Sequence, residues 1–118
     1  MSRHPQRLSD YLGHILDAID RILRYTADLD ETGFIASEMV QDAVIRNFEI
    51  VGEACRNIER HCEAFARAHP ELPLAVAYEM RNALAHGYFS VDMRIVWKTI
   101  HADLPDLQNL VRTLKQGL

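Results

Sequence analysis

Apolar residues recur every three or four positions along most of the chain, which is the period of an α-helix. Over residues 5–27 the intervening positions are polar, so this stretch predicts an amphipathic helix. Segment 28–33 is polar and predicts a break. The apolar stripe of the first helix consists of Leu8, Leu12, Ile15, Ile19 and Ile22.

The same spacing continues in a second stretch and predicts one long helix over residues 37–66, with Ser37 as its N-cap. Gly52 lies inside this helix, where a glycine costs about 1 kcal/mol relative to alanine. We therefore expect another backbone to approach Gly52 closely. The apolar positions of the stretch are Val40, Val44, Phe48, Val51, Cys55, Ile58 and Cys62.

Residues 69–73 predict a loop, followed by a helix over 74–86 that ends at Gly87. Ser90 or Asp92 is expected to cap a last helical segment, whose apolar spacing continues through Pro105. A proline removes one helical hydrogen bond and clashes with the preceding turn. We therefore expect a kinked helix or two stacked helices. The apolar positions there are Met93, Trp97, Ile100, Leu104, Leu107, Val111 and Leu114.

No stretch shows the alternation typical of strands, and no internal repeat is present. The sequence thus predicts an all-α fold, a four- to five-helix up-and-down bundle with short loops. A chain of 118 residues has the length of one domain, which we expect to span 1–118.

The net charge is −4. Proteins that bind nucleic acid over a long footprint usually carry a basic face, so this charge counts against extensive nucleic-acid binding. Contact with a single phosphate remains compatible with this charge. We see no signal peptide and no apolar run of the roughly 20 residues that cross a bilayer, so a soluble cytoplasmic protein is expected. Cys55 and Cys62 are separated by about 10 Å along a helix, too far for a disulfide. Both are expected to be buried thiols.

The chain contains no glycine-rich phosphate loop, no CxxC, no HExxH and no acidic cluster suited to a divalent cation. We predict no metal site and no cofactor. Candidate chemistry instead concentrates in the segment 81–88. Asn82 and His86 are four residues apart and share a helix face. Arg81 and His86 are five apart, about 140° around the helix, but both side chains can reach one phosphate in a groove.

These residue types suit RNA cleavage by internal transesterification. His86 can take the proton of the attacking 2′-hydroxyl, and Arg81 can stabilise the charge that develops on the phosphoryl oxygens without a metal. Asn82 can orient the histidine or the phosphate, and Tyr88 can stack a base or bind a phosphate. A two-fold dimer would bring a second His86 and a second Arg81 to the same cleft.

A structural interpretation accounts for the same residues. An arginine and a histidine near a helix C-terminus complement the negative end of the helix dipole, and Tyr88 can close the core. The alternatives to an enzyme are therefore a helical adaptor that binds a nucleotidyltransferase, and a purely structural oligomeric bundle.

The local sequence MRNALAHGYFSVD, followed by VW and DLPDL, resembles the HepT toxin-like branch of the HEPN ribonucleases. The phrase RNFEIVGEA and the opening helix YLGHILDAIDRI resemble the same branch. The resemblance implies a helical bundle, a homodimer with the motif at its interface, and metal-independent cleavage of RNA. It also implies a type VII toxin–antitoxin system, in which a minimal nucleotidyltransferase is the antitoxin.

Carried over residue by residue, the resemblance makes Arg81 and His86 the catalytic pair and Asn82 the polar residue of the motif. Tyr88 matches the tyrosine that the antitoxin modifies with AMP.

Other polar and aromatic residues receive structural interpretations. Arg46 and Glu53 share a helix face, and we favour a solvated or interhelical salt-bridge ladder over a supporting role at the site. Trp97 falls on the apolar stripe and is expected in the core, with His101 one turn away at the edge of the core. The histidines expected at the surface are His14, His61 and His69.

Overall fold

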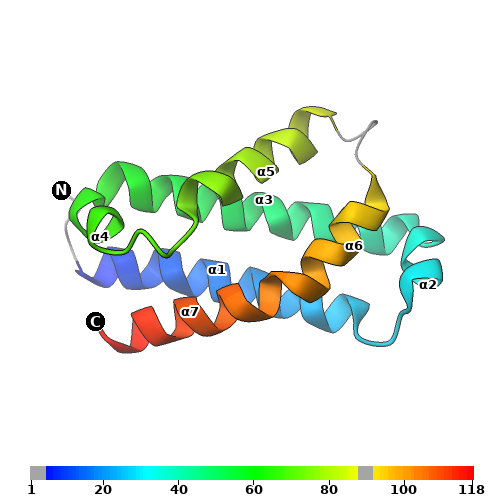
Figure 1. The fold of residues 1–118 in the computed structure, drawn as a ribbon, viewed down its shortest axis with the longest axis horizontal. Helices are drawn as coiled ribbons and strands as arrows, with labels where there is room; N and C mark the ends of the chain where they lie inside the picture. Colours follow the sequence, from blue (N-terminus) through cyan, green and yellow to red (C-terminus); the bar gives the residue numbers. More distant parts are fainter. Residues whose placement is uncertain (1–4, 88–91) are drawn as a thin grey trace.

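The computed structural model describes residues 5–87 and 92–118, which form seven helices and no strand (Figure 1). α1, α3, α5 and the α6–α7 pair run in alternating directions, so the all-α up-and-down bundle is confirmed. Two short helices, α2 and α4, lie at opposite ends. The helices are α1 Pro5–Thr26, α2 Glu31–Ile35, α3 Glu38–His61, α4 Glu63–Ala68, α5 Leu74–Gly87, α6 Met93–Ala102 and α7 Leu104–Gln116.

The core forms where α3 packs against α1 on one side and α5 on the other, with α7 lying along α1. Every predicted apolar position of the first helix is buried, and Ile15 and Ile58 are completely inaccessible to solvent. Burial of one such side chain contributes about 1.5–3 kcal/mol. α3 is therefore the central helix, and the positions of its neighbours are set by its two faces.

The second helix is shorter than predicted. Ser37 caps it as expected, with its Oγ accepting a hydrogen bond from the Val40 N–H at 3.3 Å. The helix ends at His61, however, because Cys62 adopts a non-helical backbone conformation and α4 begins at Glu63. The Cys62 N–H still donates a hydrogen bond to the Ile58 carbonyl oxygen at 2.8 Å and closes the last turn of α3. Cys62 is half-buried, and the prediction that both thiols are buried is right only for Cys55.

The break predicted over 28–33 contains the start of a short helix instead. The Asp30 carboxylate accepts a hydrogen bond from the Gly33 N–H at 2.8 Å and caps α2. Phe34, on this helix, is completely buried and packs against Trp97 of α6, with ring centroids 5.3 Å apart. A side-chain cap and one aromatic anchor thus hold a helix that apolar periodicity does not reveal.

The last segment consists of two helices, α6 and α7, which is one of the two forms predicted. Asp92 is the N-cap of α6. Its carboxylate accepts a hydrogen bond from the Arg94 N–H at 2.9 Å. Ser90, the other candidate, lies outside the described residues. Pro105 occupies the first turn of α7, where a backbone N–H has no helical partner to lose. The proline is therefore accommodated by a new helix start rather than by a kink.

The aromatic residues of α6 lie closer to the surface than predicted. Trp97 is half-buried at the edge of the core, and His101 is exposed. Of the histidines expected at the surface, His14 and His61 are exposed, whereas His69 is half-buried and contacts Glu71. Across residues 5–87 and 92–118, no helix combines the length and hydropathy needed to cross a membrane.

The two cysteines differ in burial, so their thiols should react with an alkylating reagent at different rates. Burial, with a smaller effect of the nearby Glu59 carboxylate, raises the pKa of the Cys55 thiol to about 12. At pH 8 only about one Cys55 thiol in 10⁴ is then ionised. We expect iodoacetamide to modify Cys62 in the native protein and Cys55 only after denaturation, as measured by mass spectrometry of peptides. A Cys62→Ser variant should remove the fast reaction, and rapid native modification of Cys55 would contradict its burial.

Candidate active site

The candidate catalytic helix, α5, is held against α3 at Gly52. A Cβ atom added to Gly52 would overlap the Cβ of Arg81 and lie 2.8 Å from the Arg81 Cγ and 3.1 Å from the carbonyl oxygen of Ala77. The expectation that another backbone approaches this glycine is therefore confirmed. The residue in contact is Arg81 itself, so the α3–α5 packing fixes the base of the proposed phosphate-binding side chain.

The guanidinium of Arg81 contacts two oxygen-bearing side chains. Its Nη1 donates a hydrogen bond to the Asn82 Oδ1 at 2.8 Å, and its Nη2 lies 3.5 Å from the Glu53 Oε2. The Arg81 side chain is 27% exposed and the Glu53 side chain 52%. α3 and α5 each supply one partner, and together they direct the guanidinium.

One nitrogen of this guanidinium has no partner. The Nε of Arg81 is buried and forms no hydrogen bond within the part of the chain that the structure describes. An arginine has five N–H donors arranged as a planar fork, which matches two oxygens of a phosphate or carboxylate. The buried Nε is not itself accessible, but Nη1 and Nη2 each carry a second N–H and the side chain is 27% exposed, so Arg81 retains donor capacity for an oxyanion that enters beside α5.

His86 lies in the last turn of α5 and is exposed. α5 remains helical between the two candidates, which places His86 about 7.5 Å further along the axis than Arg81 and about 140° around it. Within the described residues, no hydrogen bond or ion pair joins His86 to Arg81 or Asn82. The structure thus brings Asn82 to the arginine rather than to the histidine, and His86 faces solvent.

Tyr88, the fourth candidate, lies outside the described residues. Within residues 5–87 and 92–118, no three histidine, cysteine, aspartate or glutamate side chains form a group that could hold a metal ion.

Arg46 and Glu53, which share a face of α3, form separate ion pairs. Arg46 pairs with Glu49 within α3 at 3.7 Å, and Glu53 instead reaches Arg81 on α5. The favoured interpretation therefore holds in part, since Arg46 lies in an exposed ion pair and Glu53 in an interhelical one. The interhelical partner is Arg81, so Glu53 also supports the candidate site. Its position directly after Gly52 is compatible with this role, because the next residue lies about 100° around α3 from the glycine, at the edge of the helix contact, but the sequence does not identify the partner.

A second cross-helix contact lies one turn along α3. The guanidinium carbon of Arg56 is 5.1 Å from the centroid of the Tyr78 ring on α5, a distance at which a cation is attracted to the ring face. Arg56 also lies 3.8 Å from Glu59. Arg81 and Arg56 thus each form a polar contact between α3 and α5.

Comparison with known proteins places this helical bundle in one family. The profile of the HepT-like ribonucleases matches residues 15–114. A protein described as a probable ribonuclease HepT from Thermococcus cleftensis is 40% identical over 107 residues, which are 91% of this chain and 94% of that protein. No solved structure matches the chain.

Two further relatives are described as candidate RNases. One, from Methanocaldococcus jannaschii, is 35% identical over 101 residues, covering 86% of this chain and 90% of the relative. The other, from Caldanaerobacter subterraneus, is 31% identical over 106 residues, covering 90% and 92%. The chain belongs to the HepT-like ribonuclease family, and its enzyme class is that of a ribonuclease.

The contact at Gly52 can be tested with a matched pair of glycine substitutions. Gly13→Ala in α1 adds a Cβ 3.4 Å from the flexible Lys115 side chain and should raise the free energy of unfolding by up to about 1 kcal/mol. Gly52→Ala has the same gain in helix propensity, but overpacking against Arg81 should lower that free energy by about 1–3 kcal/mol. Denaturant titrations measure both values, and equal stabilisation by the two substitutions would refute the close contact.

Proposed function

We propose that the protein cleaves RNA by metal-independent transesterification, with Arg81 and His86 as the catalytic pair. The observation that carries this proposal is the guanidinium of Arg81, which is directed by Glu53 and Asn82 and keeps an unpartnered N–H. Preorganised donors of this kind stabilise charge where it develops in a transition state.

The reaction needs no group beyond these side chains and the RNA. The 2′-oxygen forms a bond to the adjacent phosphorus, the bond from phosphorus to the 5′-oxygen breaks, and a 2′,3′-cyclic phosphate results. A neutral His86 accepts the proton of the 2′-hydroxyl, and a protonated histidine gives one to the departing 5′-oxygen. Arg81 binds the non-bridging oxygens as their negative charge grows.

Two histidines are more effective than one in this scheme, and we infer that a homodimer supplies both. Its two-fold axis would place His86 and Arg81 of each protomer in one cleft. The exposed position of His86 at the end of α5 supports this arrangement, because its ring is accessible to a partner and to RNA. A dimer would also concentrate positive charge locally in a protein with a net charge of −4.

We further propose that the enzyme is the toxin of a type VII, or HEPN/MNT, toxin–antitoxin system in the cytoplasm. The antitoxin is a minimal nucleotidyltransferase that transfers AMP to Tyr88. The added phosphate brings negative charge close to Arg81 and His86, so it would compete with RNA for the same site.

The catalytic assignment is tested by comparing two exposed histidines. His86→Ala should reduce the rate of RNA cleavage by about 10²–10⁴-fold because it removes the proton-transfer group. His14→Ala, at an exposed position on α1, should leave the rate unchanged. Cleavage of labelled RNA by the purified protein is followed in the presence of EDTA.

Three outcomes would contradict this proposal in different ways. Equal rates for the parent and His86→Ala would exclude His86. Loss of activity in EDTA, restored by added metal, would exclude metal independence. A protein that binds a nucleotidyltransferase but cleaves no RNA would instead be a non-catalytic adaptor.

The regulatory role of Tyr88 makes a separate prediction. Co-expression with a cognate nucleotidyltransferase should increase the mass of the protein by a whole number of adenylates and abolish RNA cleavage. Tyr88→Phe should keep the parent activity but neither gain mass nor lose activity on co-expression, because it lacks the phenolic oxygen that accepts AMP. Intact-protein mass spectrometry gives the mass, and adenylation of Tyr88→Phe would show that another residue is modified.

A further inference from the structure

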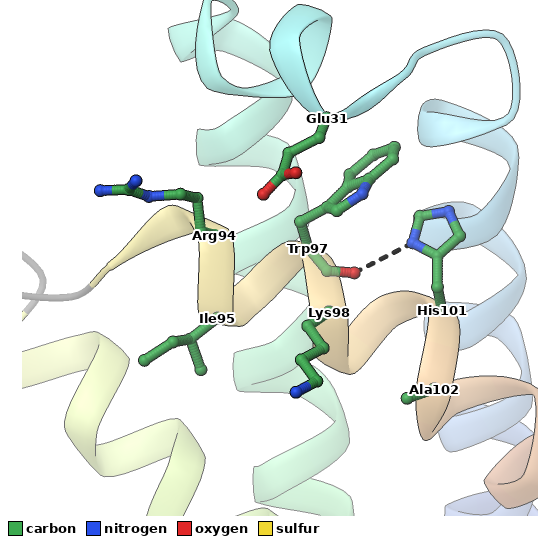
Figure 2. A pocket seen from close by; sticks show the side chains of 7 residues that line it. All are labelled: Glu31, Arg94, Ile95, Trp97, Lys98, His101 and Ala102. Carbon is green, nitrogen blue, oxygen red and sulfur yellow. Dashed lines mark hydrogen bonds between the residues drawn. The ribbon is translucent and has the colours of Figure 1, made fainter.

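A second group of side chains outside the Arg81 site surrounds a surface hollow of about 680 Å³ between α2 and α6 (Figure 2). We call it the α2–α6 hollow; its residues used below are Glu31, Arg94, Trp97, Lys98 and His101. α6 itself, from Met93 to Ala102, carries three basic side chains and no carboxylate. Carboxylates border it, because Glu31 lines the hollow and Asp92 and Asp103 cap the two ends of α6, so Lys98 is the cation of the hollow that no described carboxylate pairs with.

Aromatic rings form one wall of the hollow. The ring centroids of Trp97 and His101 are 4.1 Å apart, and Phe34 supports the indole from the core side. The His101 Nδ1–H donates a hydrogen bond to the Trp97 carbonyl oxygen at 2.9 Å, which leaves Nε2 facing away from that bond (Figure 2). The rings are therefore held in place before any ligand binds.

Several polar groups around the hollow have no partner among the described residues. The indole N–H donates no hydrogen bond, and neither the Lys98 ammonium nor the Glu31 carboxylate forms an ion pair. Figure 2 shows the Glu31 carboxylate between Arg94 and the indole. Arg94 pairs with its own helix cap, Asp92, at 3.4 Å, and its side chain is 74% exposed. Donors and an acceptor thus lie beside an aromatic wall.

We propose that the α2–α6 hollow binds one nucleotide of the RNA strand, away from the phosphate that is cleaved. A base packs against the Trp97–His101 pair, and its phosphate binds Lys98. Single-stranded RNA is commonly recognised by bases stacked on tryptophan or histidine, with cations along the backbone. Glu31 adds an acceptor for an amino group on the base edge.

The position of the hollow suits this role, which rests on the proposed ribonuclease function. Five peptide links join Gly87 at the end of α5 to Asp92 at the start of α6, so these residues are at most about 18 Å apart. In Figure 1 the C-terminal end of α5 and the N-terminal end of α6 lie at the same end of the bundle. An RNA strand at His86 can therefore continue onto α6.

The chain offers a direct probe, since Trp97 is its only tryptophan. We would titrate the intact protein with a short 2′-O-methyl oligoribonucleotide, which lacks the attacking hydroxyl and cannot be cleaved. Saturable quenching of tryptophan fluorescence is expected. Because binding is measured rather than cleavage, this experiment fails or succeeds independently of the catalytic assignment.

Matched variants locate the contact. The chain has two lysines, and Lys98→Gln should weaken binding several-fold and reduce the slope of log K against log salt by about 0.7, the value for one phosphate on a single strand. Lys115→Gln, on α7, should change neither quantity. His101→Ala should weaken binding about five- to tenfold by removing one stacking ring, whereas His14→Ala should not.

Three results would overturn the proposal. Labelled RNA could bind, as followed by anisotropy, with no change in tryptophan fluorescence. The two lysine variants could lose affinity equally, which would indicate general electrostatic attraction. Tryptophan fluorescence could instead depend on protein concentration and not on RNA, which would make the hollow a contact between copies of the chain.

Discussion

The contact between Gly52 and Arg81 is the constraint on which the site depends. It brings α5 close enough to α3 that the stem of the arginine rests on the backbone of the central helix. Glu53, the next residue, then lies within 3.5 Å of the guanidinium. Two neighbouring residues of α3 thus perform two tasks, because the glycine admits the helix and the carboxylate directs the side chain that the helix carries.

The core explains why α3 can serve as this support. α1 covers one side of it and α7 in turn covers α1, so α3 is fixed by buried apolar contacts before α5 is considered. α2 and α4 close opposite ends of the bundle. The polar contacts of Arg81 are few and partly exposed, and exposed ion pairs contribute little stability. The bundle is stabilised by apolar burial, and the site uses the rigidity that results.

Apolar periodicity predicted the main helices because each carries one continuous buried stripe, from Leu8 to Ile22 in α1 and from Val44 to Ile58 in α3. It could not predict the end of α3 at Cys62, where neither glycine nor proline marks the change in backbone conformation. α2 was missed because a single cap, Asp30, and a single anchor, Phe34, define it. In the site, Arg81, Asn82 and His86 were identifiable from spacing and chemistry. The ion pair between Glu53 and Arg81 could not be predicted from the sequence, because it depends on how α3 packs against α5.

The way α5 is attached has a dynamic consequence. Its extensive packing is against α3, and a hollow of about 560 Å³ lies between it and α7, lined by Phe48, Val76, Met80 and Leu107 among others. α5 therefore depends mainly on α3 for its position, whereas α3 is also supported by α1. Arg81 stays beside Glu53 only as long as this one helix contact holds, so any loosening of the α3–α5 packing would displace the guanidinium before it affected the packing of α1 against α3.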